Sequence, residues 1–128
     1  MAMTKMSVAL IVVGLIVSLV SVVSAIPGTA TFYDHYVPSA CYGNKNNGVM
    51  IAAASDVFWY NKAACGKMYH VRCTGSTNGV PHPCRGNGVT VKIVDYCPGC
   101  GGTIDLSKEA FAMIADPIAG RINVDYTP

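Results

Sequence analysis

The chain has 128 residues, of which nine are Lys or Arg and seven are Asp or Glu. A formal net charge of +2 gives no electrostatic footprint for nucleic acid or for an acidic membrane surface, so both classes of partner are excluded and neutral partners such as glycans fit better. The hydrophobic fraction of 52% is raised by an apolar leader, and the rest of the chain is long enough for one small core only.

Residues 1–25 form that leader. It carries one charge, Lys5, then an apolar run broken only by Gly and Ser, and it ends in the small residues Ser24 and Ala25. This pattern predicts a cleaved signal peptide, a mature chain that begins at Ile26 and an extracellular destination; an uncleaved signal anchor is the alternative. The domain, residues 26–128, then keeps eight basic and seven acidic residues and has no membrane attachment.

All six cysteines lie after the leader. An even number in a small exported domain predicts three disulfides, and six cysteines alone allow fifteen connectivities. Disulfides supply stability that so small a core lacks. The residues concerned are Cys41, Cys65, Cys73, Cys84, Cys97 and Cys100.

Short extended segments dominate the pattern before the middle of the chain. Alternation predicts strands at 28–36 and at 67–73, the second with Tyr69 and Val71 on its apolar face, and residues 49–55 form a short apolar run that predicts a buried strand. Ser55 is a predicted helix cap before the aromatic cluster 58–60. Loops rich in Pro, Gly and Asn separate these segments.

The stretch 89–116 carries the best candidate chemistry. Residues 89–96 alternate as a strand with Val89, Val91 and Ile93 inward and Val94 outward, CPGCGG forms a turn, and a short extended segment leads into a helix. Leu106, Ala110 and Ile114 have helical spacing, Ser107 is a predicted cap, and Asp116-Pro117 ends the helix. A last strand, with Ile122, Val124 and Tyr126 on one face, completes a mainly β barrel of five or six strands.

Several of these motifs together carry a family resemblance. They are TATFYD, VMIAAASDVFWYNKAACGKMYHVRC, VPHPC, the Ile-Asp-Leu-Ser segment after the cysteine turn, and AGRINVDYTP. In these the chain resembles the plant natriuretic peptide group and the expansins, with a domain similar to family 45 endoglucanases. The resemblance implies a six-stranded double-psi β-barrel with one or two short helices. It further implies the pairs Cys41–Cys65 and Cys73–Cys84, with Cys97 and Cys100 joined locally.

The same resemblance implies two carboxylates for glycoside chemistry. Asp105 matches the general acid of the endoglucanase motif, and Asp34 stands where those enzymes have a base. The structural alternatives are that Asp105 caps a helix beginning at Leu106 and that Asp34 is a turn residue. Expansins keep the acid, lack the base and are regarded as non-hydrolytic, so we expect catalytic activity to be lost.

A glycan-binding groove is the second expectation. Thr31, Tyr33 and Asp95 match groove positions of expansins, and Tyr96 and Trp59 are available as stacking platforms for sugars. The alternative to a sugar-stacking role is that Trp59 is a partly buried core or loop aromatic. Cys97-Pro-Gly-Cys100 allows a redox dithiol, but two other cysteine pairs in the domain favour a structural disulfide.

No cofactor or metal is expected, because His35, His70 and His82 lack paired ligand spacing, and no Asn-x-Ser/Thr acceptor for N-glycosylation occurs. The resemblance implies a secreted, monomeric, apoplastic protein that acts as a non-hydrolytic signal in water and solute homeostasis through a cell-surface receptor, with the signalling region between Cys41 and Cys65. Two alternatives remain: a module that binds or loosens cell-wall polysaccharide, and a weak β-glucan hydrolase that uses Asp105 as acid.

Overall fold

A computed structural model describes residues 24–128. The predicted signal peptide lies outside the described residues, apart from Ser24 and Ala25. The first strand begins at Ile26, the residue that the leader pattern assigns to the start of the mature chain. No helix in the described part of the chain is long and apolar enough to cross a membrane.

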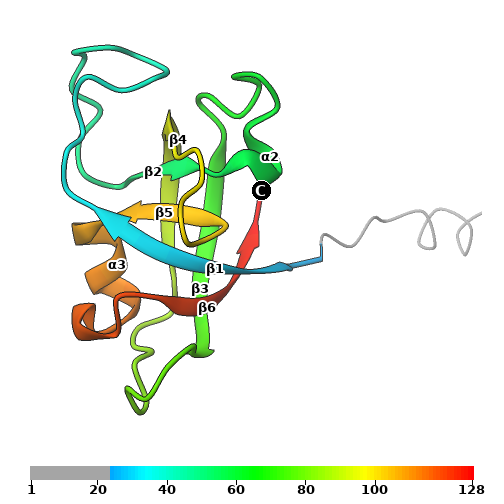
Figure 1. Cartoon of the computed structure of the whole chain (residues 1–128), viewed down its shortest axis with the longest axis vertical. Helices are drawn as coiled ribbons and strands as arrows, with labels where there is room; N and C mark the ends of the chain where they lie inside the picture. Colours follow the sequence, from blue (N-terminus) through cyan, green and yellow to red (C-terminus); the bar gives the residue numbers. More distant parts are fainter. Residues whose placement is uncertain (1–23) are drawn as a thin grey trace, which may run out of the picture.

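Six strands close into one barrel (Figure 1). Their order around it is β1-β5-β2-β4-β3-β6. The strands are β1 Ile26–Tyr33, β2 Ile51–Ala54, β3 Met68–Ser76, β4 Val89–Tyr96, β5 Ile104–Ser107 and β6 Ile122–Thr127.

Two of the neighbouring pairs, β1 with β5 and β2 with β4, are parallel, and the other four are antiparallel. Closure leaves no open sheet edge, and it places β5, a strand of four residues, between β1 and β2. The predicted double-psi β-barrel is confirmed.

The barrel interior holds the inward side chains that alternation predicts. Val89, Val91 and Ile93 of β4 lie in one core cluster with Tyr69 and Val71 of β3, and Ile122, Val124 and Tyr126 of β6 join them. Tyr69 and Tyr126 pack against Phe58 with ring centroids 5.5 and 5.6 Å away. This packing fixes which residues of each strand face outward.

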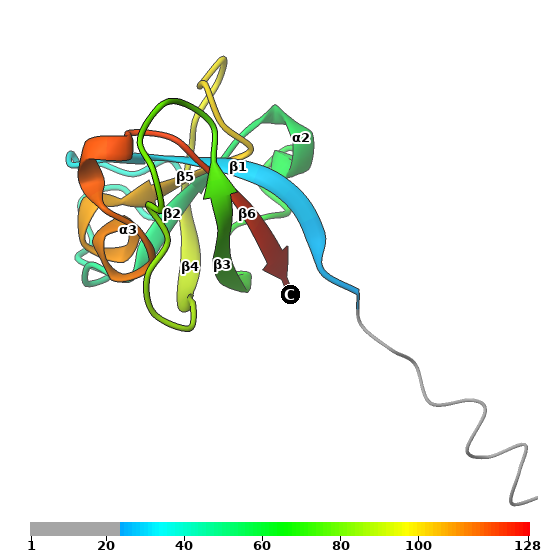
Figure 2. The same ribbon diagram turned by 90° about the horizontal axis from the view of Figure 1, so that it is seen from below.

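The α-helices α2 and α3 of the described residues lie on different sides of the barrel (Figures 1 and 2). α2 is short, Asp56–Trp59, and Ser55 caps it as predicted. α3, Lys108–Ile114, begins after its cap Ser107, so Leu106 belongs to β5 and the alternative in which Asp105 caps the helix is wrong. α3 also ends before Asp116, which instead caps the 3-10 helix η1, Pro117–Ala119.

The first strand and Val94 differ from the sequence-based expectation. β1 covers 26–33 rather than 28–36, so Asp34 lies beyond its end. Val94, predicted to face outward with Lys92, is buried because the register between β2 and β4 shifts there, and the shifted strand lies under the loop 34–50. The Cys41 amide donates to the Val94 carbonyl (3.0 Å), which holds the loop in place.

Three disulfides join the pairs that the resemblance implies: Cys41–Cys65, Cys73–Cys84 and Cys97–Cys100. The first ties the loop 34–50 to the segment after α2, and the second ties β3 to the loop before β4. The third closes the turn between β4 and β5. All six cysteines are therefore consumed.

Candidate functional site

Four residues form a row across the outside of four adjacent strands. Thr31 of β1 pairs with Asp105 of β5, Asp105 pairs with Ala53 of β2, and Ala53 pairs with Asp95 of β4. Residues that are directly opposite in a sheet present their side chains on the same face. The barrel therefore brings Thr31, Asp105 and Asp95 together on one outer face, although the sequence separates Thr31 from the others by more than 60 residues.

Asp105 is the partly buried acid of this row. The Thr31 hydroxyl donates to Asp105 Oδ1 (2.9 Å). Burial raises the pKa of the Asp105 carboxyl above its ordinary value, the Thr31 hydrogen bond acts in the opposite direction, and the charge of Asp95 raises the pKa further. A carboxyl held in this way is suited to donate a proton or a hydrogen bond to a sugar oxygen.

Asp95 plays a different part, because it anchors the long loop. Its Oδ1 accepts the amide of Ala40 (2.8 Å) and that of Tyr96 (2.9 Å). Both donors are backbone amides, one from the long loop and one from β4 itself. Asp95 is thus an acceptor and a structural tie at one end of the row.

Tyr33 lies two residues beyond Thr31 in β1 and so shares its face. Its hydroxyl is covered and has no hydrogen-bond partner in the described part of the protein. Burial, together with the charges of Asp95 and Asp105, raises the pKa of Tyr33 above its ordinary value. The ring meets that of Tyr36 edge to face, with centroids 5.4 Å apart.

Trp59 and Tyr96 form an aromatic stack beside the row. Their ring centroids are 4.7 Å apart and their planes differ by 11°. Trp59 is half-buried and packs against the core, which agrees with the alternative of a core or loop aromatic. The Tyr96 hydroxyl bonds to Asp56 Oδ1. The pair is a rigid, partly exposed aromatic surface next to Asp95.

Asp34 is not brought into the row. It is 62% exposed, and Oδ1 lies 2.9 Å from Nδ1 of His35, which is itself 96% exposed. The residue expected as a base thus faces solvent beyond the end of β1.

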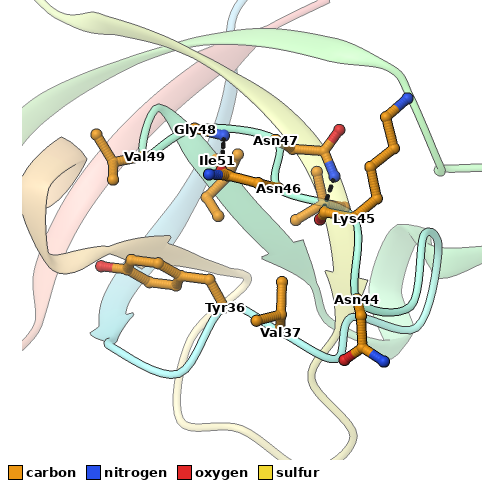
Figure 3. Close-up of a pocket in the computed structure, with 10 residues that line it drawn as sticks. Tyr36, Val37, Asn44, Lys45, Asn46, Asn47, Gly48, Val49 and Ile51 are labelled. Carbon is orange, nitrogen blue, oxygen red and sulfur yellow. Dashed lines mark hydrogen bonds between the residues drawn. The ribbon is translucent and has the colours of Figure 1, made fainter.

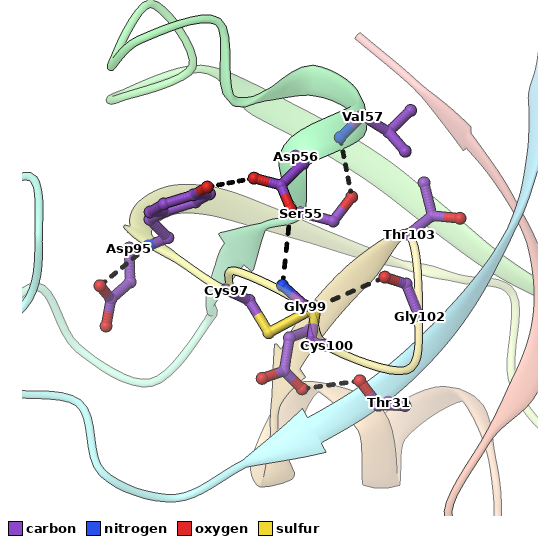
Figure 4. The surroundings of a disulfide bond; sticks show 12 residues. Thr31, Ser55, Asp56, Val57, Asp95, Cys97, Gly99, Cys100, Gly102 and Thr103 are labelled. Atoms are coloured by element: carbon purple, nitrogen blue, oxygen red, sulfur yellow. Dashed lines mark hydrogen bonds between the residues drawn. A yellow bond between two sulfur atoms is a disulfide. The ribbon is translucent and has the colours of Figure 1, made fainter.

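The cysteine turn forms a wall beside the row (Figure 4). In that view the Cys97–Cys100 disulfide lies between Asp95 on one side and Thr103 on the other. Gly102 rests on β1: a Cβ at this position would lie 3.2 Å from the Thr29 carbonyl oxygen and 3.3 Å from the Thr31 amide nitrogen. A Cβ at these distances would crowd the backbone of β1, so glycine favours the close approach of the turn to the strand.

A separate cavity of about 310 Å³ lies under the loop 34–50 (Figure 3). Tyr36, Val37 and Ile51 line it together with the Asn-rich tip of the loop, residues 44–49. None of Thr31, Asp95 and Asp105 reaches it. Within residues 24–128 no three His, Cys, Asp or Glu side chains are grouped so as to hold a metal ion.

Sequence reasoning missed a polar hollow of about 330 Å³ on the other side of the cysteine turn. Thr29, Thr103, Asp56 and Arg121 line it together with residues 99–102 of the cysteine turn. Thr29 and Thr103 each precede a row residue by two positions, so the same strand alternation that places Thr31 and Asp105 could have found them. Arg121 has no such signal in the sequence.

Comparison with known proteins agrees with this geometry. A double-psi β-barrel family model described as lytic transglycolase matches residues 51–126, more than half of the chain. An EG45-like domain containing protein of Citrus jambhiri is 64% identical over 102 residues, covering 77% of this chain and 78% of its relative. The chain belongs to the EG45-like family of double-psi β-barrel proteins.

Solved structures extend the likeness of this EG45-like protein to expansins. The apo expansin of Clavibacter michiganensis superposes with a TM-score of 0.64 at 26% identity over 82% of this chain. A mutant of that expansin, solved in complex with cellohexaose, gives a TM-score of 0.58 at the same identity and coverage. The EG45-like chain spans 50% of the length of the bacterial protein.

Proposed function

We propose that this protein is a secreted, cell-wall-directed glycan-binding barrel that holds a β-linked glucan chain on its outer face without cleaving it. The row Thr31–Asp105–Ala53–Asp95 carries the proposal, because it offers hydroxyl and carboxyl groups in a line across four strands. The Trp59–Tyr96 stack beside it provides the flat apolar surface that sugar rings need. The cellohexaose complex of the related expansin supports a glucan as the ligand class.

The absence of cleavage is inferred from the partners of the carboxylates. Hydrolysis needs a base or nucleophile opposite the acid. Asp34 lies outside the row, and Oδ1 of Asp95 is already held by two backbone amides that fix the loop 34–50. Asp105 then acts as a hydrogen-bond donor and acceptor for sugar hydroxyls.

Co-sedimentation with insoluble cellulose, a β-linked glucan, tests this function, and xylan serves as the comparison polymer. The purified protein is expected to sediment with a polymer, and Asp105→Asn, which alters the row, is expected to weaken binding about tenfold, the loss of one or two hydrogen bonds to a charged group. Asp34→Asn makes the same charge change outside the row and serves as the control. If neither the wild-type protein nor the variant sediments with any wall polymer, the proposal is wrong.

A weak β-glucan hydrolase is the second candidate, and the raised pKa of Asp105 favours it, since a general acid must stay protonated near its working pH. Release of new reducing ends from glucan or xyloglucan is the required observation. Asp105→Asn must abolish it, and Asp95→Asn tests whether the remaining oxygen of Asp95 activates water.

The role as an apoplastic signal in water and solute homeostasis is a third candidate. The Cys41–Cys65 disulfide favours it, because it closes a compact segment on which the apolar side chains of Val49, Val57 and Tyr60 are exposed. A receptor would read that surface. The test is a change in plant protoplast volume on addition of the protein, and an equal response to the Tyr60→Ala, Val49→Ser double variant would exclude this surface.

A further inference from the structure

The polar hollow beyond the cysteine turn adjoins the proposed glycan row. Thr29 and Thr31 lie on the same face of β1, and Thr103, which immediately precedes β5, is likewise two residues before Asp105. Arg121 immediately precedes Ile122, which pairs with Ala30 on the side of β1 away from β5. Arg121 therefore lies beyond β1, at the Thr31 end of the row.

The hydroxyls of Thr29 and Thr103 are hydrogen-bond acceptors whose own donor hydrogens are unused. Thr103 Oγ1 accepts the Thr29 amide (3.1 Å), and Thr29 Oγ1 accepts the Thr103 amide (3.3 Å). Neither hydroxyl donates a hydrogen bond to another described residue. Because a hydroxyl is one donor and two acceptors, each threonine can still donate a hydrogen bond into the hollow.

Arg121 brings the charge. Its guanidinium is exposed and forms no ion pair with any residue from 24 to 128, whereas Arg72 on β3 pairs with Asp125. Asp56 also lines the hollow, but its two oxygens face the Tyr96 hydroxyl and the Gly99 amide (Figure 4). The hollow therefore combines a free guanidinium with two free hydroxyl donors, a set that matches a carboxylate.

We propose that Arg121, Thr29 and Thr103 bind the carboxylate of a uronic acid, so that the ligand is a neutral-backbone polysaccharide with isolated uronate units. This inference rests on the proposed glycan row. The charge pattern sets the position of the uronate: Asp105, Asp95 and Asp56 repel a carboxylate, so the uronate lies against Arg121 while neutral sugars lie over Asp105 and Asp95. A uniformly acidic chain would place charge over both ends and is disfavoured.

Titration calorimetry with three defined oligosaccharides tests the proposal on the protein purified after expression of the full chain. The probes are xylotetraose that bears one glucuronic acid, the same compound with that carboxyl reduced to an alcohol, and cellohexaose. We expect the uronate compound to bind about tenfold more tightly than its reduced form, as one charge-assisted contact implies. Arg121→Gln is expected to remove this preference and Arg121→Lys to keep most of it.

Arg85→Gln is the matched control, because Arg85 is exposed and lies beside the end of α3, where its Nε donates to the Ala112 carbonyl. It makes the same charge change and should keep the preference. Equal binding of the acid and its reduced form would overturn the uronate site, and so would a preference that survives Arg121→Gln. Cellohexaose separates the two proposals: if it binds while the acid shows no advantage, only this inference fails, and if none of the three binds, both fail.

Discussion

At the scale of single residues, the hydrogen bond between Thr31 and Asp105 tunes the acid. The bond favours the charged carboxylate, so Thr31→Val is expected to raise the pKa of Asp105 beyond the value that burial already gives it. Carboxyl chemical shifts followed by NMR against pH measure the change. Thr29→Val is the control on the same strand, and an unchanged or lower Asp105 pKa in Thr31→Val would contradict the account.

Asp105 also makes stability depend on pH. Because the pKa of Asp105 is raised in the folded state, the folded protein binds the proton more readily than the unfolded chain. The free energy of unfolding therefore decreases as pH rises from the ordinary pKa of 3.8 through the folded pKa of Asp105. Above the folded pKa this decrease is complete and the contribution of Asp105 is constant. Asp105→Asn lacks this loss, so urea unfolding should show its stability relative to the wild type improving across that window. If the stability of Asp105→Asn relative to the wild type falls across that window, the pKa of Asp105 is not raised in the folded state.

The covered hydroxyl of Tyr33 has no partner among the described residues, which costs the folded state free energy. Tyr33→Phe is expected to leave the free energy of unfolding unchanged or to raise it by about 1 kcal/mol. Urea denaturation decides this. Tyr36→Phe, which removes the bond to Glu109, is expected to destabilise the protein and provides the contrast.

At the scale of elements, the loop 34–50 is held to the barrel from several sides. The Ser107 hydroxyl is central, because it donates to the Val49 carbonyl and accepts the Ala110 amide (3.1 Å) as the cap of α3. Ser107→Ala should lower the free energy of unfolding by about 2 kcal/mol, the loss of a cap plus an unpaired carbonyl. Ser55→Ala, whose capping bond is longer at 3.4 Å, should cost less. Equal costs would mean that the Val49 contact contributes nothing.

The disulfides are expected to contribute unequally. Cys41–Cys65 spans 24 residues and Cys97–Cys100 spans three. In the chain-entropy view, replacing the first pair by serine costs about 3–4 kcal/mol and replacing the second about 2 kcal/mol. Urea unfolding of the two double variants without reductant compares their free energies of unfolding. A larger loss for the Cys97/Cys100 variant would show that this disulfide stabilises the barrel by more than the entropy of closing its short loop.

At the scale of the whole molecule, much of the barrel could be predicted from local pattern. The inward residues of β3, β4 and β6 agree with alternation, and Ser107 agrees with capping preference. The prediction for Leu106 is wrong, because its spacing to Ala110 fits a helix as well as a strand that leads into a helix. The predicted face of Val94 is wrong, because the register shift at Ala52 and Ala53 of β2 depends on a strand that lies more than 30 residues earlier in the chain.

The candidate site shows the same division. Thr31, Tyr33, Asp95 and Asp105 could be chosen from a family resemblance, but their alignment through Ala53 is a property of barrel closure. Thr29, Thr103 and Arg121 meet only because β1 lies between β5 and β6. No local pattern of residues carries that information.

One measurement bears most directly on the central claim that the outer row holds a glucan without cleaving it. The protein is titrated with cellohexaose by calorimetry, and the same mixture is analysed by mass spectrometry after prolonged incubation. We expect saturable binding that Asp105→Asn weakens and Asp34→Asn does not, and we expect the hexaose to be recovered intact. Shorter oligosaccharides formed by the wild type and not by Asp105→Asn would contradict it, and so would a titration without binding.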